Sequence, residues 1–165
     1  MNEAAALRPS AGFLLSHPAH FIALGFGTGL SRVAPGTVGT LLAIPLHLVL
    51  ARWLGPLAIL ALVPGLFALG VWACGRSGRD LGVTDHSGIN WDEIVAYLLV
   101  LVFTPAGVAW QVVAFLAFRF FDIAKPPPIR HIDRTVKGGF GVMLDDLLAA
   151  FYTLLLLAVA KTALA

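Results

Sequence analysis

IVAYLLVLVFTPAGVAWQVVAFLAF, residues 94–118, contains no charged side chain over its whole length. Similar charge-free runs occupy residues 33–51, 53–75 and 147–160. Apolar runs of this length are typical of helices embedded in a membrane. The composition agrees, since 59% of the 165 residues are hydrophobic and only 12% are charged, whereas an ordinary globular domain has about 25% charged residues. The alternative is a wholly buried helix bundle, but a chain of this size has too little polar surface to cover such a core.

A turn divides the quoted run into two short helices. The sequence TPAG at residues 104–107 is a strong turn signal, and the residue before a proline avoids the helical region. The segments on either side, residues 75–93 and 119–140, both carry lysine or arginine. Such loops favour the cytoplasmic side of a membrane. Two loops on one side need an even number of crossings between them, so we expect a hairpin that turns at Pro105.

The same reasoning makes a second hairpin of residues 38–51 and 57–74, which turns at Gly55 and Pro56. Residues 74–93 are then a polar loop, and residues 141–160 form the last apolar helix. Residues 1–24 are a mixed lead-in, in which residues 13–15 and 21–24 suggest a short interfacial helix.

The sequence therefore predicts an all-α fold, a compact multi-helix membrane-embedded bundle. About five apolar helical segments lie in hairpins, and the polar loops gather on one face. We expect a single domain over residues 1–165. Several segments are shorter than the roughly 20 residues that a full crossing needs, so their depth in the bilayer stays open.

Two further features limit the class of protein. The first residues lack the layout of a signal peptide, since Arg8 is the only early basic residue and no long apolar core follows it. We therefore expect the N-terminus to be retained. The single cysteine, Cys74, excludes an internal disulfide and a cysteine-based zinc cluster.

The acidic residues are unevenly distributed. Eight of the nine lie between Asp80 and Asp146, and the predicted hairpins bring them to one face. Clustered carboxylates raise one another's pKa values unless a cation lies among them, and ligand sets made only of oxygen suit a hard cation such as Mg²⁺. For Asp80, Asp85 and Asp133, neutralisation of neighbouring lysines and arginines is an equal alternative.

Two pairs of adjacent acids mark helix ends. We expect Asp145–Asp146 about one turn into the last apolar helix, where adjacent side chains point roughly 100° apart. One can then face a metal while the other serves a second ligand or a basic partner. Asp92–Glu93 repeats the arrangement at the start of residues 94–118, with Asn90 available as the N-cap. Ionisable groups at the head of an embedded helix are a functional site by default.

A phosphate site is also indicated. The sequence APGTVGT, residues 34–40, places Gly36 and Thr37 immediately before a helix, where free backbone N–H groups bind anions. Ordinary helix capping is the alternative. Arg119 and Asp122 are spaced i, i+3 and share a helix face. Carboxylates for Mg²⁺, a helix N-terminus and basic residues at a membrane face together suit phosphoryl chemistry on a lipid headgroup.

Three blocks of the chain resemble the phosphatidylglycerophosphatase A family. They are GTGLSRVAPGTVGT at residues 27–40, DHSGINWDEIVAY at residues 85–97 and FRFFDIAKPPPIRHIDRTVKGGFGVMLDDLLAA at residues 118–150. The resemblance implies a Mg²⁺-dependent hydrolase of the bacterial inner membrane with its active site facing the cytoplasm. Such an enzyme converts phosphatidylglycerophosphate into phosphatidylglycerol and phosphate in glycerophospholipid biosynthesis. We expect its partners to be this substrate and membrane lipid, with no nucleic acid, while the oligomeric state stays open.

On this interpretation the acids hold one or two Mg²⁺ ions and the basic residues grip the phosphate. The expected metal ligands are Asp92, Glu93, Asp122, Asp145 and Asp146. The expected catalytic residues are Asp92, Asp122 and Asp146, and the expected phosphate-binding residues are Gly36, Thr37, Arg119, Lys125 and Arg130. Attack by water and a covalent aspartyl phosphate both remain open.

Two rival functions remain. The first is a metal-dependent phosphatase of another lipid phosphate. The second is a small cation-transport subunit, which is disfavoured because its acids would be spread through the middle of the apolar segments rather than placed at their ends.

Overall fold

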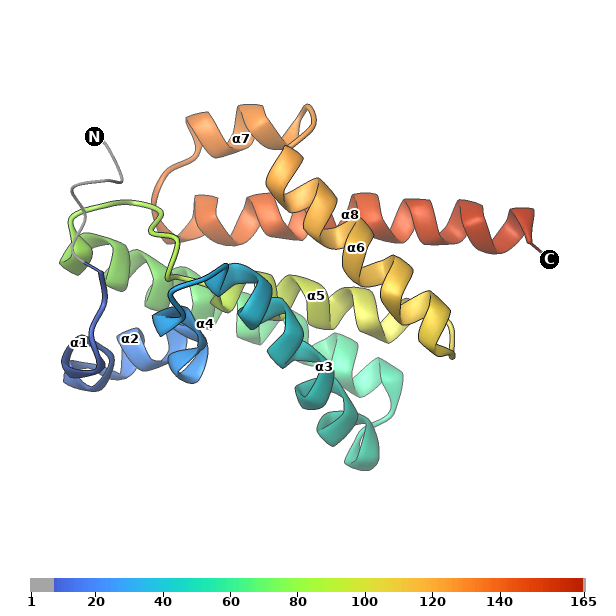
Figure 1. Ribbon diagram of the computed structural model, residues 1–165, viewed down its shortest axis with the longest axis horizontal. Helices are drawn as coiled ribbons and strands as arrows, with labels where there is room; N and C mark the ends of the chain where they lie inside the picture. The colour runs from blue at the N-terminus through green and yellow to red at the C-terminus, as the bar shows by residue number, and fades with distance from the viewer. Residues whose placement is uncertain (1–7, 165) are drawn as a thin grey trace.

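The structure is a computed structural model that describes residues 8–164, and over this range its regular elements are all helices (Figure 1). They are α1 (Ala11–Ser16), α2 (Pro18–Ala23), the 3₁₀ helix η2 (Gly25–Leu30), α3 (Pro35–Trp53), α4 (Pro56–Leu81), α5 (Trp91–Phe103), α6 (Val108–Ala124), α7 (Ile129–Thr135) and α8 (Gly138–Ala163). The predicted all-α, multi-helix class is confirmed. The first residues of the predicted lead-in, 1–7, lie outside the described range, and residues 11–23 of it form α1 and α2.

Both predicted hairpins are present. α5 ends at Phe103 and α6 begins at Val108, so the TPAG turn separates two antiparallel helices that contact one another. α3 and α4 are joined through Leu54 and Gly55. The start of α3, the end of α4, the start of α5, the end of α6 and the start of α8 therefore lie towards the same end of the molecule (Figure 1).

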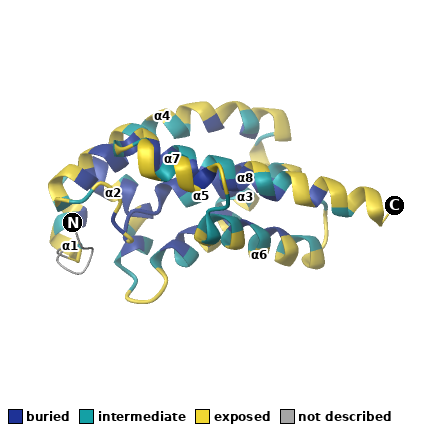
Figure 2. Cartoon of the chain, turned by 90° about the horizontal axis from the view of Figure 1, so that it is seen from above, coloured by how far each residue is buried: buried dark blue, intermediate teal, exposed yellow. Residues whose placement is uncertain are grey.

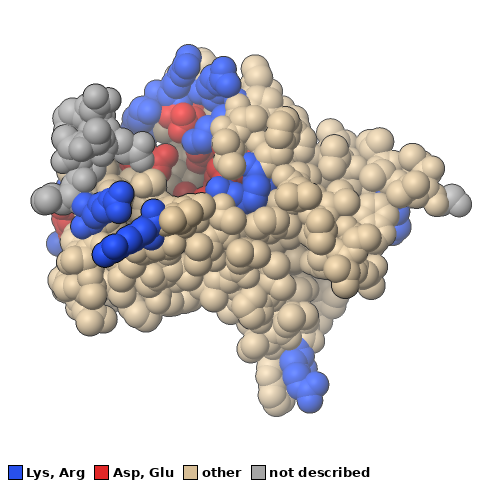
Figure 3. Space-filling view, viewed as in Figure 1, with Lys and Arg blue, Asp and Glu red and all other residues tan. Residues whose placement is uncertain are grey.

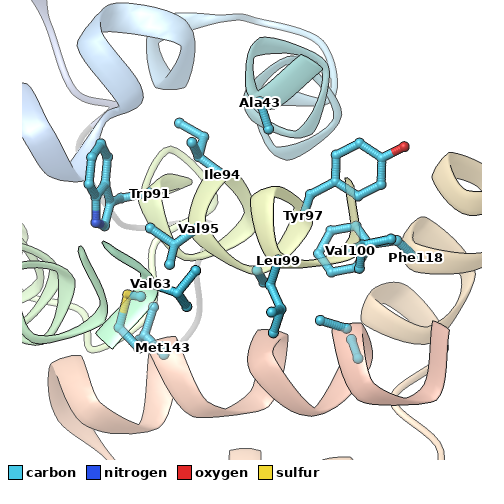
Figure 4. Packing of buried hydrophobic residues seen from close by; sticks show 14 of the residues in the cluster. Ala43, Val63, Trp91, Ile94, Val95, Tyr97, Leu99, Val100, Phe118 and Met143 are labelled. Atoms are coloured by element: carbon cyan, nitrogen blue, oxygen red, sulfur yellow. The ribbon is translucent and has the colours of Figure 1, made fainter. Parts of the chain in front are cut away.

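The short helix α5 forms the centre of the bundle. Ten of its 13 residues are buried, and it packs against α3, α4, α6 and α8. A helix that is apolar all round belongs in an interior. Figure 4 shows Leu99 on the side of α8 and Tyr97 beside Phe118 of α6, with ring centroids 5.3 Å apart. Trp91 donates through Nε1 to the carbonyl of Leu66 at 3.1 Å, which ties the start of α5 to α4.

Helix α3 meets α5 through small side chains. Its buried residues are Gly36, Gly39, Thr40 and Ala43, which lie on one helical face because they are three or four residues apart. Small residues at this spacing let two helix backbones approach closely, as in many membrane proteins. The first turns of α3 and α5, which carry the candidate site residues, are therefore held side by side.

Three described helices are long and apolar enough to cross a membrane, namely α3, α4 and α8. Their outer faces carry exposed large hydrophobic side chains such as Leu48, Leu57 and Leu155, and Figure 2 shows long exposed stretches on α4 and α8. Apolar faces of this extent are unusual on a soluble monomer. They fit a bundle embedded in lipid. With 13 residues, α5 is too short to span the bilayer.

Three predicted boundaries are wrong. α4 runs to Leu81 instead of giving way to a loop at residue 74. It stops at Gly82, which has φ 75° and lets the N–H of Val83 bond the carbonyl of Gly78 at 3.0 Å. α8 begins at Gly138 rather than residue 141, so Asp145 and Asp146 lie about two turns inside it. The helix ends were predicted from the ends of the apolar runs. Both helices continue beyond those runs through glycines or charged residues, so both extensions were missed.

The third correction concerns the start of α3. Pro35 occupies the first position of the helix, where its missing N–H costs nothing. Gly36 and Thr37 therefore belong to the first turn of α3 and do not precede it.

Candidate active site

Three carboxylates from three different helices form a compact group. Glu93 comes from α5, Asp122 from α6 and Asp146 from α8, and one ligand oxygen from each lies within 4.8 Å of the others. The hairpins position them, because each residue stands near the polar end of its helix. A group of this kind can hold a metal ion.

Arg119 neutralises part of this group. Its Nη1 donates to Glu93 Oε1 at 2.7 Å and to Asp122 Oδ2 at 2.6 Å. The i, i+3 pairing of Arg119 with Asp122 was predicted from the sequence and is confirmed. Nη1 also lies 3.4 Å from the hydroxyl of Thr40 on α3. The guanidinium Nε is buried without a described hydrogen-bond partner, so it remains able to donate to a ligand.

Asp145 has a different partner from Asp146, as expected for adjacent helical residues, which point about 100° apart. Its Oδ2 lies 2.5 Å from Lys125 Nζ, and Lys125 also contacts Asp133 Oδ1 at 2.9 Å. Lys125 ends α6 in the left-handed conformation, with φ 43°. The basic partner expected for one acid of this pair is therefore present, while a metal facing the other acid stays a prediction.

Four buried carboxylate oxygens lack a described hydrogen-bond partner. They are Asp92 Oδ1, Glu93 Oε2, Asp145 Oδ1 and Asp146 Oδ2. A buried charged oxygen without a partner is costly. Two of these four belong to the first turn of α5, and the other two lie about two turns inside α8. A bound divalent cation would remove that cost, so the residues present fit a metal site.

The two acids at the head of α5 have shifted pKa values. Burial, followed by the charge of Asp122, raises the pKa of Glu93 to about 8, although Arg119 opposes the shift. Burial, followed by Glu93 and Asp85, raises the pKa of Asp92 well above its ordinary range. Burial first and mutual repulsion second thus disfavour the charged forms of both carboxylates, and a cation between them would oppose both effects.

Gly36 lies directly against the acidic group. A Cβ at this position would overlap Glu93 Oε1 and come within 2.7 Å of Glu93 Cδ. Thr37, one residue further on, is half-buried. Arg130 is exposed and donates to the carbonyl of Ala124 at 3.1 Å. Of the predicted phosphate-binding residues, the structure therefore brings Gly36, Arg119 and Lys125 to the acids and leaves Arg130 at the rim.

Asn90 occupies the N-cap position of α5, as expected, but its side chain makes no capping hydrogen bond. Its Nδ2 donates instead to Thr28 Oγ1 and to the carbonyl of Pro35, each at 2.9 Å. The residue thus joins the start of α5 to the turn before α3.

Thr40, which the sequence did not single out, is buried and donates to the carbonyl of Gly36 at 3.0 Å. Its i+4 spacing from Gly36 was the available signal.

A second polar constellation lies outside the acidic group. His20 of α2 has Nδ1 2.9 Å from Ser77 Oγ and Nε2 3.2 Å from Asp80 Oδ2. The order of groups is that of a Ser-His-Asp triad, but Ser77 is fully buried and no substrate could reach it. Asp80 also pairs with Arg76 at 2.7 Å. This network joins α2 to α4, and no sequence pattern predicted it.

Charge gathers at one end of the molecule. Figure 3 shows acidic side chains within a hollow that lysine and arginine side chains surround, while most of the remaining visible surface is uncharged. The described exceptions lie near the opposite helix ends, where Arg52 is in the last turn of α3 and Lys161 in the last turn of α8.

Known proteins with similar sequences bear on this site. The profile of the phosphatidylglycerophosphatase A family matches residues 21–161. The chain is 44% identical to phosphatidylglycerophosphatase A of Haemophilus influenzae, with 86% of this chain and 87% of the relative covered. It is 42% identical to phosphatidylglycerophosphatase A of Escherichia coli, over 82% of this chain and 78% of the relative.

A third relative carries a different name. A protein of Bacteroides thetaiotaomicron, provisionally named a phosphatidylinositol-3-phosphatase, is 39% identical over 85% of this chain and 91% of its own length. No solved structure was found to match. The family profile covers most of the chain, including every residue of the acidic group, so the chain belongs to the phosphatidylglycerophosphatase A family and is a phosphatase.

Proposed function

We propose that this protein is a Mg²⁺-dependent phosphatase that hydrolyses phosphatidylglycerophosphate to phosphatidylglycerol and phosphate. The observation that carries the proposal is the group of Glu93, Asp122 and Asp146, in a chain whose relatives are named phosphatidylglycerophosphatase A. Its single-domain chain would work in the bacterial inner membrane.

Glu93, Asp122 and Asp146 would hold the metal, with Asp92 and Asp145 beside them. Mg²⁺ is favoured because every nearby donor is a carboxylate oxygen and Mg²⁺ prefers oxygen ligands. When bound, the ion would supply positive charge to the phosphoryl oxygens and lower the pKa of a bound water.

The basic residues would bind the phosphate. Arg119 already holds two of the acids in place through Nη1 and keeps its buried Nε available. Lys125 would add a second positive charge, and the N–H groups in the first turn of α3, at Gly36 and Thr37, would face the anion. Together they would stabilise the charge that develops on phosphorus oxygens during transfer.

Asp92 is the proposed general base. Its Oδ1 is buried and unpartnered, and a raised pKa suits a group that accepts a proton near neutral pH. It would take the proton of the attacking water, while Asp122 and Asp146 keep the reacting groups aligned.

The distribution of basic residues supports a site that faces the cytoplasm. Apart from Arg52 and Lys161, the described lysines and arginines lie in the loops and helix ends on the side of the acidic group. Positively charged loops are retained in the cytoplasm.

A second candidate substrate is another phosphorylated lipid headgroup. It is favoured by the 39% identical relative that carries a phosphoinositide phosphatase name. Both substrates present a phosphomonoester at a membrane surface, so the acidic group alone does not separate them.

The test is phosphate release by the purified protein from phosphatidylglycerophosphate and from phosphatidylinositol 3-phosphate, with Mg²⁺ or with chelator. We expect Mg²⁺-dependent release from the first lipid. Asp146→Asn should lower kcat/KM about a hundredfold or more, because it removes one oxygen ligand. Asp80→Asn, which removes a carboxylate of the α2–α4 network, is the matched control and should retain activity. The proposal would be refuted by a rate of phosphate release that chelator does not lower, or by faster release from phosphatidylinositol 3-phosphate than from phosphatidylglycerophosphate.

A further inference from the structure

A pocket of about 350 Å³ lies beside the acidic group. Its walls come from the loop before α3, the loop before α5 and the segment before α1. This volume is within the range of small-molecule sites. The pocket lies at the same charged end of the molecule as the hollow in Figure 3.

The pocket wall continues directly into the proposed catalytic site. Pro35 lines the pocket, and the next residue, Gly36, lies against the Glu93 carboxylate. Consecutive Cα atoms are about 3.8 Å apart, so a ligand could contact the pocket and the acidic group at once. The two sites are neighbours along a single surface.

The wall is built from backbone in close contact. A Cβ at Gly29 would overlap the carbonyl oxygen of Gly88, so η2 and the loop before α5 touch here. Asn90 joins the start of α5 to the first residue of α3 through its bond to the carbonyl of Pro35. The buried His86 accepts the N–H of Gly88 through Nδ1 at 2.9 Å. These contacts hold the pocket in a defined shape.

Two arginines line the pocket, Arg8 and Arg32, and no acidic residue does. Among the residues that the structure describes, neither arginine has an ion-pair partner, unlike Arg119, Lys125 and Arg76. Guanidinium groups bind phosphate oxygens with two parallel hydrogen bonds. The pocket is thus suited to an anion rather than to a metal.

We propose that this pocket binds the phosphodiester phosphate of the lipid substrate, while the acidic group receives the terminal phosphomonoester. The inference rests on the proposed function and adds a second phosphate subsite to it. Phosphatidylglycerophosphate has both phosphates, joined by a glycerol spacer that would pass over Pro35 and Gly36. Binding energy from this non-reacting phosphate would position the reacting one.

The test separates the two phosphates with two competing inhibitors. Phosphatidylglycerol has the diester and lacks the monoester, whereas inorganic phosphate mimics only the monoester. In neutral-detergent micelles, Arg8→Ala/Arg32→Ala should raise the inhibition constant of phosphatidylglycerol about tenfold or more. The KM for the substrate should rise by a similar factor, and the inhibition constant of inorganic phosphate should stay unchanged.

Arg134→Ala is the matched control. It removes one positive charge from an exposed position on α7, at the same end of the molecule but outside the pocket, and should behave like the wild type. An unchanged KM in the double variant, an equal weakening of both inhibitors, or a wild-type enzyme that phosphatidylglycerol does not inhibit would overturn the subsite.

Failure of the proposed function would look different. A folded wild-type protein that releases no phosphate from phosphatidylglycerophosphate would refute the activity. Calorimetry would then measure the binding of short-chain phosphatidylglycerol to the wild type and to the double variant. This measurement needs no turnover, so it tests the proposed phosphodiester subsite alone. Equal affinities of both proteins would refute that subsite.

Discussion

The backbone of Gly36 lies against the carboxylate of Glu93, with no room between them for a side chain. Helix α3 thereby fixes the position of an acid that α5 carries. Gly36→Ala should lower kcat/KM by about a hundredfold, because the new methyl group displaces Glu93 and small misplacements in a catalytic group have effects of this size.

Gly65→Ala is the control for this variant. Gly65 lies within α4, and nothing would lie within 4 Å of its new Cβ. We expect full activity from it. Steady-state kinetics compare the two, and normal turnover by Gly36→Ala would show that the Glu93 position does not matter.

Mg²⁺ should stabilise the folded protein. The buried oxygens of Asp92, Glu93, Asp145 and Asp146 lack described partners, and a cation that binds only the folded state adds about 2.7 kcal/mol at a hundred times its Kd. Thermal unfolding in detergent should therefore shift upward on titration with Mg²⁺. Asp146→Asn should lose most of the shift and Asp80→Asn should keep it. A shift of equal size in all three proteins would place the ion elsewhere.

The ion pair of Lys125 with Asp145 predicts a rescue. Lys125→Met leaves the largely buried Asp145 without its cation, and an unpaired buried charge costs about 3 kcal/mol. The melting temperature should fall by about 6 °C or more. Adding Asp145→Asn should recover most of the loss. The double-mutant cycle measures the coupling, and additive losses would argue against it.

The network around His20 predicts a pH-dependent stability. Burial lowers the pKa of His20 from its ordinary value of 6.5, against the opposing charge of Asp80. The folded state therefore binds fewer protons on this side chain than the unfolded state. Its contribution to the free energy of unfolding is complete above pH 6.5 and is lost as the pH falls below that value.

His20→Gln should remove this dependence. The difference in melting temperature between the wild type and the variant should be largest near pH 8 and should shrink towards pH 5, with Mg²⁺ present throughout. Comparing the two proteins cancels the titration of the acidic group. A constant difference over this range would mean that His20 does not titrate during unfolding.

Much of the architecture could be predicted from the sequence. The TPAG turn and the position of basic residues were enough to pair α5 with α6 and to place Glu93 and Asp122 at one end. Asp146 followed because its helix starts at that end. These signals are local, since they consist of the prolines and glycines of turns and the charged residues of loops.

The rest depends on contacts that no local pattern records. The bond from His20 to Ser77 joins residues 57 positions apart. Nothing in the sequence around either residue predicts that the two side chains meet. The N-cap position of Asn90 could be predicted, but its side-chain partners could not, since Thr28 belongs to η2 and Pro35 to α3. The basic pocket also needed three separate segments to be folded before Arg8 and Arg32 could be seen together.

The chain order adds a consequence for biosynthesis. Among the described helices, α8 leaves the ribosome last, and it carries Asp145 and Asp146. Until it inserts, α5 lacks one of its packing surfaces and Lys125 lacks its buried counter-ion. A nascent chain stopped before α8 would hold this helix and this charge uncompensated in the bilayer, which makes it a target for membrane proteases. Insertion of α8 thus supplies the packing surface of α5 and the counter-ion of Lys125 in one step.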